Sequence, residues 1–247
     1  RMYMRSGKPT LTSNTFERYH GTVYDRTMTL NGTVLKSFIL LFIVMITAMY
    51  SWQQYFAGKD VMGLILVGAI GSLIVGIITV FVPKIAPFTA PVYAALEGLF
   101  VGSISAHFES FFEGITLQAI LLTFGVFLAL LFAYTTRIIK PTQNFRLGVA
   151  AATGGIFIVY LLNFILSFFG MNVPFLHDNS GIGIGISIFI VIIAALNLVL
   201  DFDFIEQGVA GGSPKYMEWY GAFGLIVTLI WLYLEILRLL AKINSRK

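Results

Sequence analysis

Residues 179–200 read NSGIGIGISIFIVIIAALNLVL, a run of 22 residues without a charge between Asp178 and Asp201. The hydrocarbon core of a bilayer is about 30 Å thick, and a helix needs about 20 mostly apolar residues to cross it. This run is long enough and apolar enough for one membrane-spanning helix. It therefore points to a membrane protein built from α-helices.

Four more uncharged runs along the chain satisfy the same criterion. They hold 22, 23, 23 and 31 residues and lie between Lys36 and Lys59, Asp60 and Lys84, Glu113 and Arg137, and Arg146 and Asp178. Two further spans are predicted if one acidic residue is accepted in each, Glu97 in the first and Glu235 in the second. The seven predicted helices are 37–56, 61–82, 88–107, 115–134, 147–169, 182–204 and 219–241.

The fold class that follows is an all-α, polytopic membrane protein with seven transmembrane helices. The transmembrane domain covers residues 37–242. A polar, basic tail of residues 1–36 precedes it, and a short basic tail of residues 243–247 follows it. The lipid bilayer is the first partner that this organisation implies.

The composition excludes several classes of protein. Of the 247 residues, 57% are hydrophobic and only 11% are charged, whereas a soluble domain carries about 25% charged residues. A soluble enzyme with one compact core is therefore excluded, and a membrane β-barrel, whose strands alternate apolar and polar residues, is disfavoured. The chain has no cysteine, so disulfides, zinc–thiolate sites and thiol catalysis are excluded.

The placement of lysine and arginine predicts the orientation in the membrane. With the N-terminus inside, eleven basic residues lie on the inner side and five on the outer side, and cytoplasmic segments carry the excess of positive charge. The N-terminal tail is therefore expected in the cytoplasm. The basic C-terminus conflicts with this count. The net charge of +4 does not indicate nucleic-acid binding, because the basic residues lie in tails and loops.

Acidic residues inside the predicted spans are the candidates for function. A carboxylate in hydrocarbon costs roughly 2.5 to 3.5 kcal/mol even on insertion scales, so it faces a cavity, a partner or water. Four residues qualify: Glu97, Asp201, Asp203 and Glu235. No lysine or arginine lies well inside a predicted span, although Arg238 is spaced for an ion pair with Glu235 on the same helix. This acid-rich interior suits a path for cations or protons.

Helix geometry ranks the candidates. Asn197 and Asp201 are four residues apart and share one face of the sixth helix. Asp203 lies on the opposite side and nearer the membrane surface, as a second interior acid or as part of a wetted helix end. Glu97 has small neighbours that allow close helix approach, so a structural role and a transport role both fit. No set of nucleophile and base is visible, so neither an enzyme nor a bound cofactor is expected.

Four stretches carry a resemblance to a known family. They are MTLNGT at 28–33, APVYAALEGLF at 90–100, YMEWY at 216–220 and WLYLEIL at 231–237. Together they resemble the Bax inhibitor-1/YccA-like membrane proteins, the transmembrane Bax inhibitor motif family, over nearly the whole chain. The chain is most similar to a bacterial branch with a longer N-terminal tail, which implies a multi-pass protein of the inner (plasma) membrane.

The resemblance also implies a fold and a function. The last of seven helices is expected to be enclosed by the other six. Some members are described as pH-sensitive calcium leak channels that are gated by two aspartates on helices six and seven. The second falls here on Glu235, in Leu-Tyr-Leu-Glu where those members have Leu-Tyr-Leu-Asp, and the first falls on Asp201 or Asp203. Asp201 and Glu235 are then candidate Ca²⁺ ligands, with Asn197 beside them.

The resemblance implies a second kind of function as well. Other bacterial members are linked to the modulation of a membrane-bound AAA protease. The chain would then be a regulator that moves no ion, and its polar tail could be gripped by the protease or by another membrane complex. Deleting residues 1–22 separates the two hypotheses.

Overall fold

The computed structural model describes residues 27–174 and 176–247, and all the long elements in these ranges are α-helices. Of the tail predicted over residues 1–36, residues 1–26 lie outside the described residues. The elements are α2 (Leu30–Phe56), α3 (Met62–Phe81), the 3₁₀ turn η1 (Pro83–Ile85), α4 (Ala86–Phe111), α5 (Ile115–Thr135), α6 (Gln143–Ser167), α7 (Gly181–Ala210) and α8 (Met217–Asn244). Within the described ranges, seven helices are long and apolar enough to cross a membrane, which confirms the predicted fold class.

Several helices extend beyond their predicted ends. The helix α2 begins at Leu30 instead of residue 37, α6 begins at Gln143 instead of residue 147, and α7 continues to Ala210. The first two begin after capping hydroxyl groups, since the side chains of Thr29 and Thr142 accept hydrogen bonds from backbone N–H groups of their first turns. The predictions for α2 and α6 began just after Lys36 and Arg146, but both helices include these residues, each of which pairs with a carboxylate.

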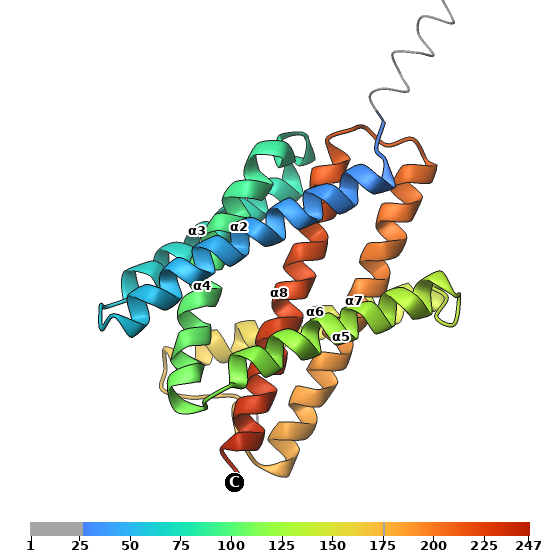
Figure 1. Cartoon of the computed structure of the whole chain (residues 1–247). Helices are drawn as coiled ribbons and strands as arrows, with labels where there is room; N and C mark the ends of the chain where they lie inside the picture. The colour runs from blue at the N-terminus through green and yellow to red at the C-terminus, as the bar shows by residue number, and fades with distance from the viewer. Residues whose placement is uncertain (1–26, 175) are drawn as a thin grey trace, which may run out of the picture.

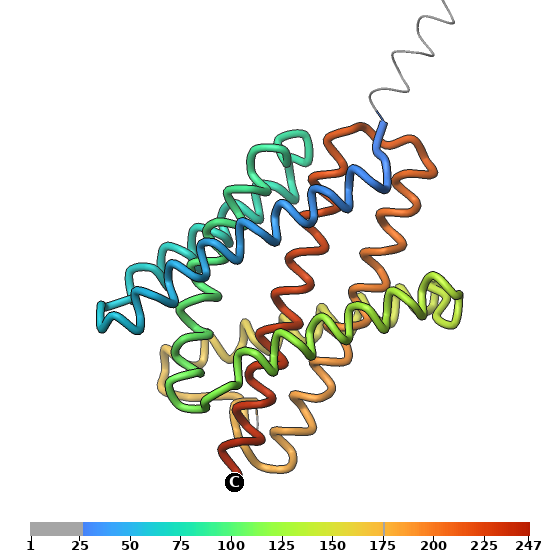
Figure 2. Tube along the Cα trace, viewed as in Figure 1, coloured from blue at the N-terminus to red at the C-terminus, as the bar shows by residue number. Residues whose placement is uncertain are grey.

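The helices α7 and α8 run antiparallel and pack side by side through the middle of the bundle (Figure 1). The start of α2 meets the α7–α8 connection, and the C-terminus lies at the opposite end (Figure 2). The backbone N–H of Met28 donates a hydrogen bond of 2.7 Å to the carbonyl oxygen of Ser213 there. The start of α2 is thus fixed near the start of α8, and the chain ends at the other end of α8.

The last helix is the most buried of the seven. In its most apolar window, 61% of the residues of α8 are buried, against 11–44% for the other helices. Its backbone lies close to α2, α4, α5 and α7, and aromatic side chains of α6 and α8 meet where Phe157 packs against Trp231. Four polar residues of α8 are accordingly buried, namely Glu218, Thr228, Glu235 and Lys242. Its complete enclosure by all six other helices remains a prediction.

Two glycines allow α4 to lie close against α2. A Cβ atom on Gly102 would lie 2.2 Å from the carbonyl oxygen of Ala48, and one on Gly98 would lie 2.5 Å from that of Val44. Small residues four positions apart permit such close approach of two membrane helices. The predicted close packing around Glu97 is therefore confirmed, with these two glycines as its cause.

We expect Gly102→Ala to destabilise the protein, because the added methyl group meets a backbone oxygen that cannot turn away. The loss should be about 1–3 kcal/mol, the range for overpacked sites. Thermal unfolding of the purified protein in detergent measures it.

The matched control is Gly125→Ala on α5, where a Cβ atom would find nothing within 4 Å. Alanine is the better helix former by about 1 kcal/mol, so this variant should be at least as stable as the unsubstituted chain. Equal stability of the two variants would show that the close approach of α2 and α4 does not limit the size of residue 102.

Candidate functional site

Asp201 has a buried oxygen without a hydrogen-bond partner. The side chain extends from α7 toward α8 and lies beside Thr228. Its Oδ2 atom has no partner within the described part of the chain, and no ion pair found there includes Asp201. A buried polar oxygen without a partner is costly. The Oδ2 atom is therefore available to bind a proton, a cation or a hydrogen-bond donor.

Glu235 accepts a hydrogen bond from a tyrosine. Its side chain is 3% exposed, and the Tyr160 hydroxyl of α6 donates a hydrogen bond of 2.5 Å to Oε1. Arg238 donates a 3.3 Å hydrogen bond to the same hydroxyl oxygen, and its guanidinium lies over the Tyr160 ring. The expected pairing of Glu235 with Arg238 is therefore bridged by Tyr160. The second oxygen, Oε2, has no partner among the described residues.

The structure does not bring Asp201 and Glu235 together. Asp201 lies level with Thr228, which precedes Glu235 by seven residues, or about 10 Å along α8. The two carboxyl groups also face different neighbours, since Glu235 contacts α6. Asp201 on α7 and Glu235 on α8 therefore lie at two different levels of the bundle.

Asp203 has a cationic partner. Arg146 Nη2 lies 2.6 Å from its Oδ2 atom, and Gln207 donates a 3.1 Å hydrogen bond to the same oxygen. Arg146 can reach it because α6 begins at Gln143, so this arginine belongs to the helix rather than to the preceding loop. Of the two interpretations of Asp203, the polar helix end describes these contacts better than a second interior acid.

Asn197 and Glu97 make contacts that join helices. Asn197 Nδ2 donates hydrogen bonds of 2.8 Å to Thr153 Oγ1 on α6 and to the carbonyl oxygen of Ile193. Glu97 on α4 lies beside Ser72 of α3. Neither contacts Asp201 or Glu235 through a hydrogen bond found in the described ranges. No group of three or more acidic or histidine side chains in those ranges could hold a metal ion.

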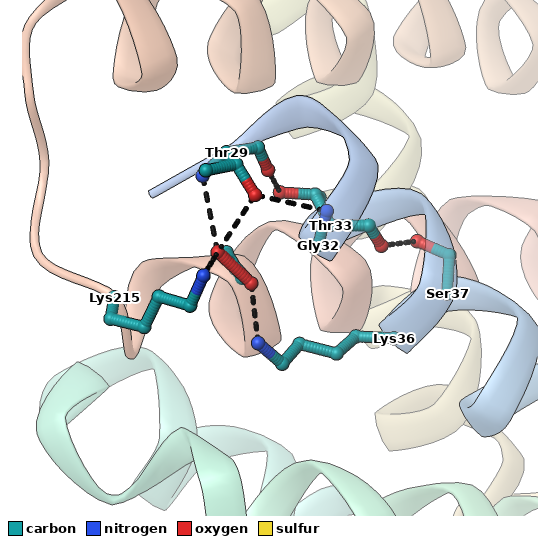
Figure 3. A network of polar contacts seen from close by, with 7 residues as sticks. Thr29, Gly32, Thr33, Lys36, Ser37 and Lys215 are labelled. Carbon is teal, nitrogen blue, oxygen red and sulfur yellow. Dashed lines mark hydrogen bonds and ion pairs between the residues drawn. The ribbon is translucent and has the colours of Figure 1, made fainter. Parts of the chain in front are cut away.

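The most buried carboxylate among the described residues was not among the sequence candidates. Glu218, in the first turn of α8, is fully buried. Its Oε1 atom accepts hydrogen bonds from the backbone N–H of Thr29 at 3.1 Å and from the Thr29 hydroxyl at 3.2 Å, and Lys215 lies 2.8 Å away. Lys36 pairs with Oε2. Figure 3 shows Thr29, Lys36 and Lys215 converging on this carboxylate.

The residues of this cluster lie in two stretches that the sequence analysis had singled out, but one sequence does not show that the two stretches are in contact. The stretches 28–33 and 216–220, which carried part of the resemblance, pack against each other here. A Cβ atom on Gly32 would lie 2.1 Å from Glu218 Oε2, so only glycine leaves room for the carboxylate. In the sequence, Lys36 and Glu218 are merely charges at the ends of two spans, 182 residues apart.

Comparison with known proteins gives one match. Residues 8–245, which include all seven long helices, match the family described as Bax inhibitor 1 like. No curated protein and no solved structure matches the chain. The match extends over nearly the whole chain and confirms the resemblance drawn from the four sequence stretches.

We expect Glu218→Gln to destabilise the protein, because it leaves Lys36 and Lys215 beside each other without the carboxylate between them. Breaking a buried ion pair costs about 3–5 kcal/mol, and the loss should lie near 3 kcal/mol because the Lys215 side chain is half exposed. Thermal unfolding measures the change. The control is Glu113→Gln, an exposed acid between α4 and α5, and similar unfolding of both variants would contradict this role for Glu218.

Proposed function

Because the chain belongs to the Bax inhibitor 1 like family of multi-pass membrane proteins, we propose that it is a pH-sensitive leak channel or transporter for cations. Calcium is the ion that we expect. The buried carboxyl groups of Asp201 on α7 and Glu235 on α8 gate it. The protein lies in the inner membrane with its N-terminus in the cytoplasm.

One observation supports this function above others. Asp201 and Glu235 each keep one buried oxygen without a hydrogen-bond partner among the described residues; Glu235 belongs to the most buried helix of the bundle, and Asp201 faces that helix from α7. Intramembrane carboxyl groups are rare and mark ion or proton paths when they are not paired. Asp203 and Glu218, in contrast, both have cationic partners.

The two groups act as successive positions along α8. Ca²⁺ takes six to eight oxygen ligands, of which Asp201 or Glu235 supplies some and backbone carbonyls, water and Asn197 supply others. Between the two levels α8 carries Leu229 and Leu232, which are both buried in apolar contacts. We take this arrangement as a closed state, and opening requires α8 to shift relative to α6 and α7.

The pH response comes from competition between protons and cations for the carboxyl groups. The ionisable groups that face Glu235 are Tyr160 on α6, Arg238 and Lys242 on α8, and His177 on the α6–α7 connection. Burial lowers the pKa of His177 below its ordinary value, and the nearby cations of Arg238 and Lys242 lower it further. His177 therefore stays neutral above about pH 6.5, and a response above that pH arises elsewhere.

The test is calcium flux into liposomes that contain the purified protein, measured from pH 5 to pH 8. Asp201→Asn and Glu235→Gln replace each carboxyl group by an amide that cannot ionise and resembles the protonated acid. We expect each variant to lose most of the pH dependence and to behave at every pH as the unsubstituted protein does at its lowest pH.

Glu113→Gln serves as the control, since it removes an exposed acid outside the helices. It should leave the pH profile unchanged. Folded protein that passes no cation at any pH in this range would refute the proposal.

A second function is favoured by the way in which the N-terminal segment joins the bundle. Thr27 forms a β-bridge with Pro214, and Thr29 and Lys36 contact Glu218 at the start of α8. A partner that grips the preceding residues would act on the most buried helix through these contacts. The chain would then be a regulator that binds a membrane-bound protease and moves no ion.

Deleting residues 1–22 distinguishes the two functions, because the deletion leaves Thr27, Met28 and the Glu218 contacts in place. A channel should keep its calcium flux in liposomes after this deletion. A regulator should lose its partner, which is measured by co-purification of a membrane-bound AAA protease with the full chain and with the shortened one. Unchanged co-purification would refute the tail as the site that the protease binds.

A further inference from the structure

A large groove opens between α2 and α5, and neither Asp201 nor Glu235 lines it. Its volume is about 1110 Å³, and its floor is formed by α7 and α8. The elements that bound it can be followed in Figure 1. Most of the side chains that line it are apolar, and several of them are exposed, among them Val34 and Phe38 on α2 and Leu128 on α5.

Such a groove cannot stand empty in a membrane. It exceeds the range of about 300–1,000 Å³ for ordinary ligand pockets. Water needs two to four polar partners to occupy a cavity stably, and the apolar walls offer few. Hydrocarbon surrounds the helices at this depth, so an acyl chain of a lipid is the occupant that matches the walls.

One end of the groove is basic. Arg137, Lys140 and Arg146 line it there. Two acids share this lining: Asp203 pairs with Arg146, and Glu206 accepts a hydrogen bond from the neutral Tyr134 hydroxyl and keeps its charge. Three cations and two carboxylates leave one net positive charge at this end. Among the described residues, no ion pair includes Arg137 or Lys140.

One feature of the basic end favours an anionic ligand, and a second decides which substitution can test it. The Nε atom of Arg146 is buried and has no hydrogen-bond partner in the described part of the chain, although its Nη2 atom contacts Asp203. Arg137 has a φ of 60°, a left-handed conformation that residues other than glycine rarely adopt. A basic pocket between membrane helices is the usual site for the headgroup of an anionic lipid.

We propose that this groove binds one anionic phospholipid. Its acyl chain lies between α2 and α5, and its phosphate group contacts Arg137, Lys140 and the Nε atom of Arg146. The lipid contacts neither Asp201 nor Glu235, which do not line the groove, and it binds whether or not the protein passes ions.

The test is native mass spectrometry of the purified full chain in detergent with added phosphatidylglycerol, phosphatidylcholine or inorganic phosphate. We expect phosphatidylglycerol to be retained and the other two to be lost at the same concentration. Arg137→Gly with Lys140→Gln should weaken phosphatidylglycerol binding by about 10-fold to 30-fold, as expected for two basic groups near the headgroup. Glycine suits the left-handed backbone at residue 137, so this variant removes the cation without straining the fold.

A second pair of variants tests the apolar wall. Val34→Trp fills the groove and should abolish retention, whereas Val67→Trp adds the same bulk at an exposed position on α3 that does not line it. Lys84→Gln, an exposed cation outside the lining, is the control for charge.

Three results would overturn the proposal. Equal retention of both lipids would exclude recognition of the anionic headgroup. Binding of inorganic phosphate as tight as that of phosphatidylglycerol would show that the acyl chain contributes nothing. Unchanged retention in Val34→Trp would place the lipid outside the groove.

Discussion

The buried carboxylate of Glu218 joins the first and last membrane helices, and the arrangement of the rest depends on that junction. It accepts hydrogen bonds from Thr29 and pairs with Lys36 and Lys215 while it is fully shielded from solvent. A buried charge is tolerable only when it is paired and hydrogen-bonded. The start of α2 and the start of α8 must therefore stay together, which sets the position at which α8 enters the bundle.

From that entry point, α8 carries a series of polar groups through an apolar core. Asp201 meets it at Thr228, Tyr160 meets it at Glu235, and Lys242 is buried near its far end. Lys242 donates to the carbonyl oxygens of Leu176 and Gly183 and to the Ser187 hydroxyl. The charges of the last helix thus serve internal contacts. Of the four basic residues at the C-terminal end, Arg238 and Lys242 make these internal contacts, whereas Arg246 and Lys247 are exposed.

The two halves of the bundle around α8 differ in how tightly they pack. On one side, α4 is locked against α2 through Gly98 and Gly102, and Gly68 of α3 lies against its other face. On the other side, α2 and α5 leave a groove of about 1110 Å³ between them. Glycine removes the side chain that would hold helices apart, whereas the exposed side chains of Phe38 and Leu128 line the groove. The helices α2, α3 and α4 are therefore closely packed on one side, and the groove between α2 and α5 lies on the other.

The sequence by itself determined the seven helices, their order and the carboxyl groups inside them, because a 30 Å hydrocarbon layer imposes a length and a composition that can be counted along the chain. It also determined the family, since the four stretches that carried the resemblance lie within the matched residues. Only the tertiary structure decided which carboxyl groups have partners. Arg146 neutralises Asp203, Lys36 neutralises Glu218, and Tyr160 separates Glu235 from Arg238. Each of these contacts joins residues far apart in the chain, and spacing along one helix cannot reveal them.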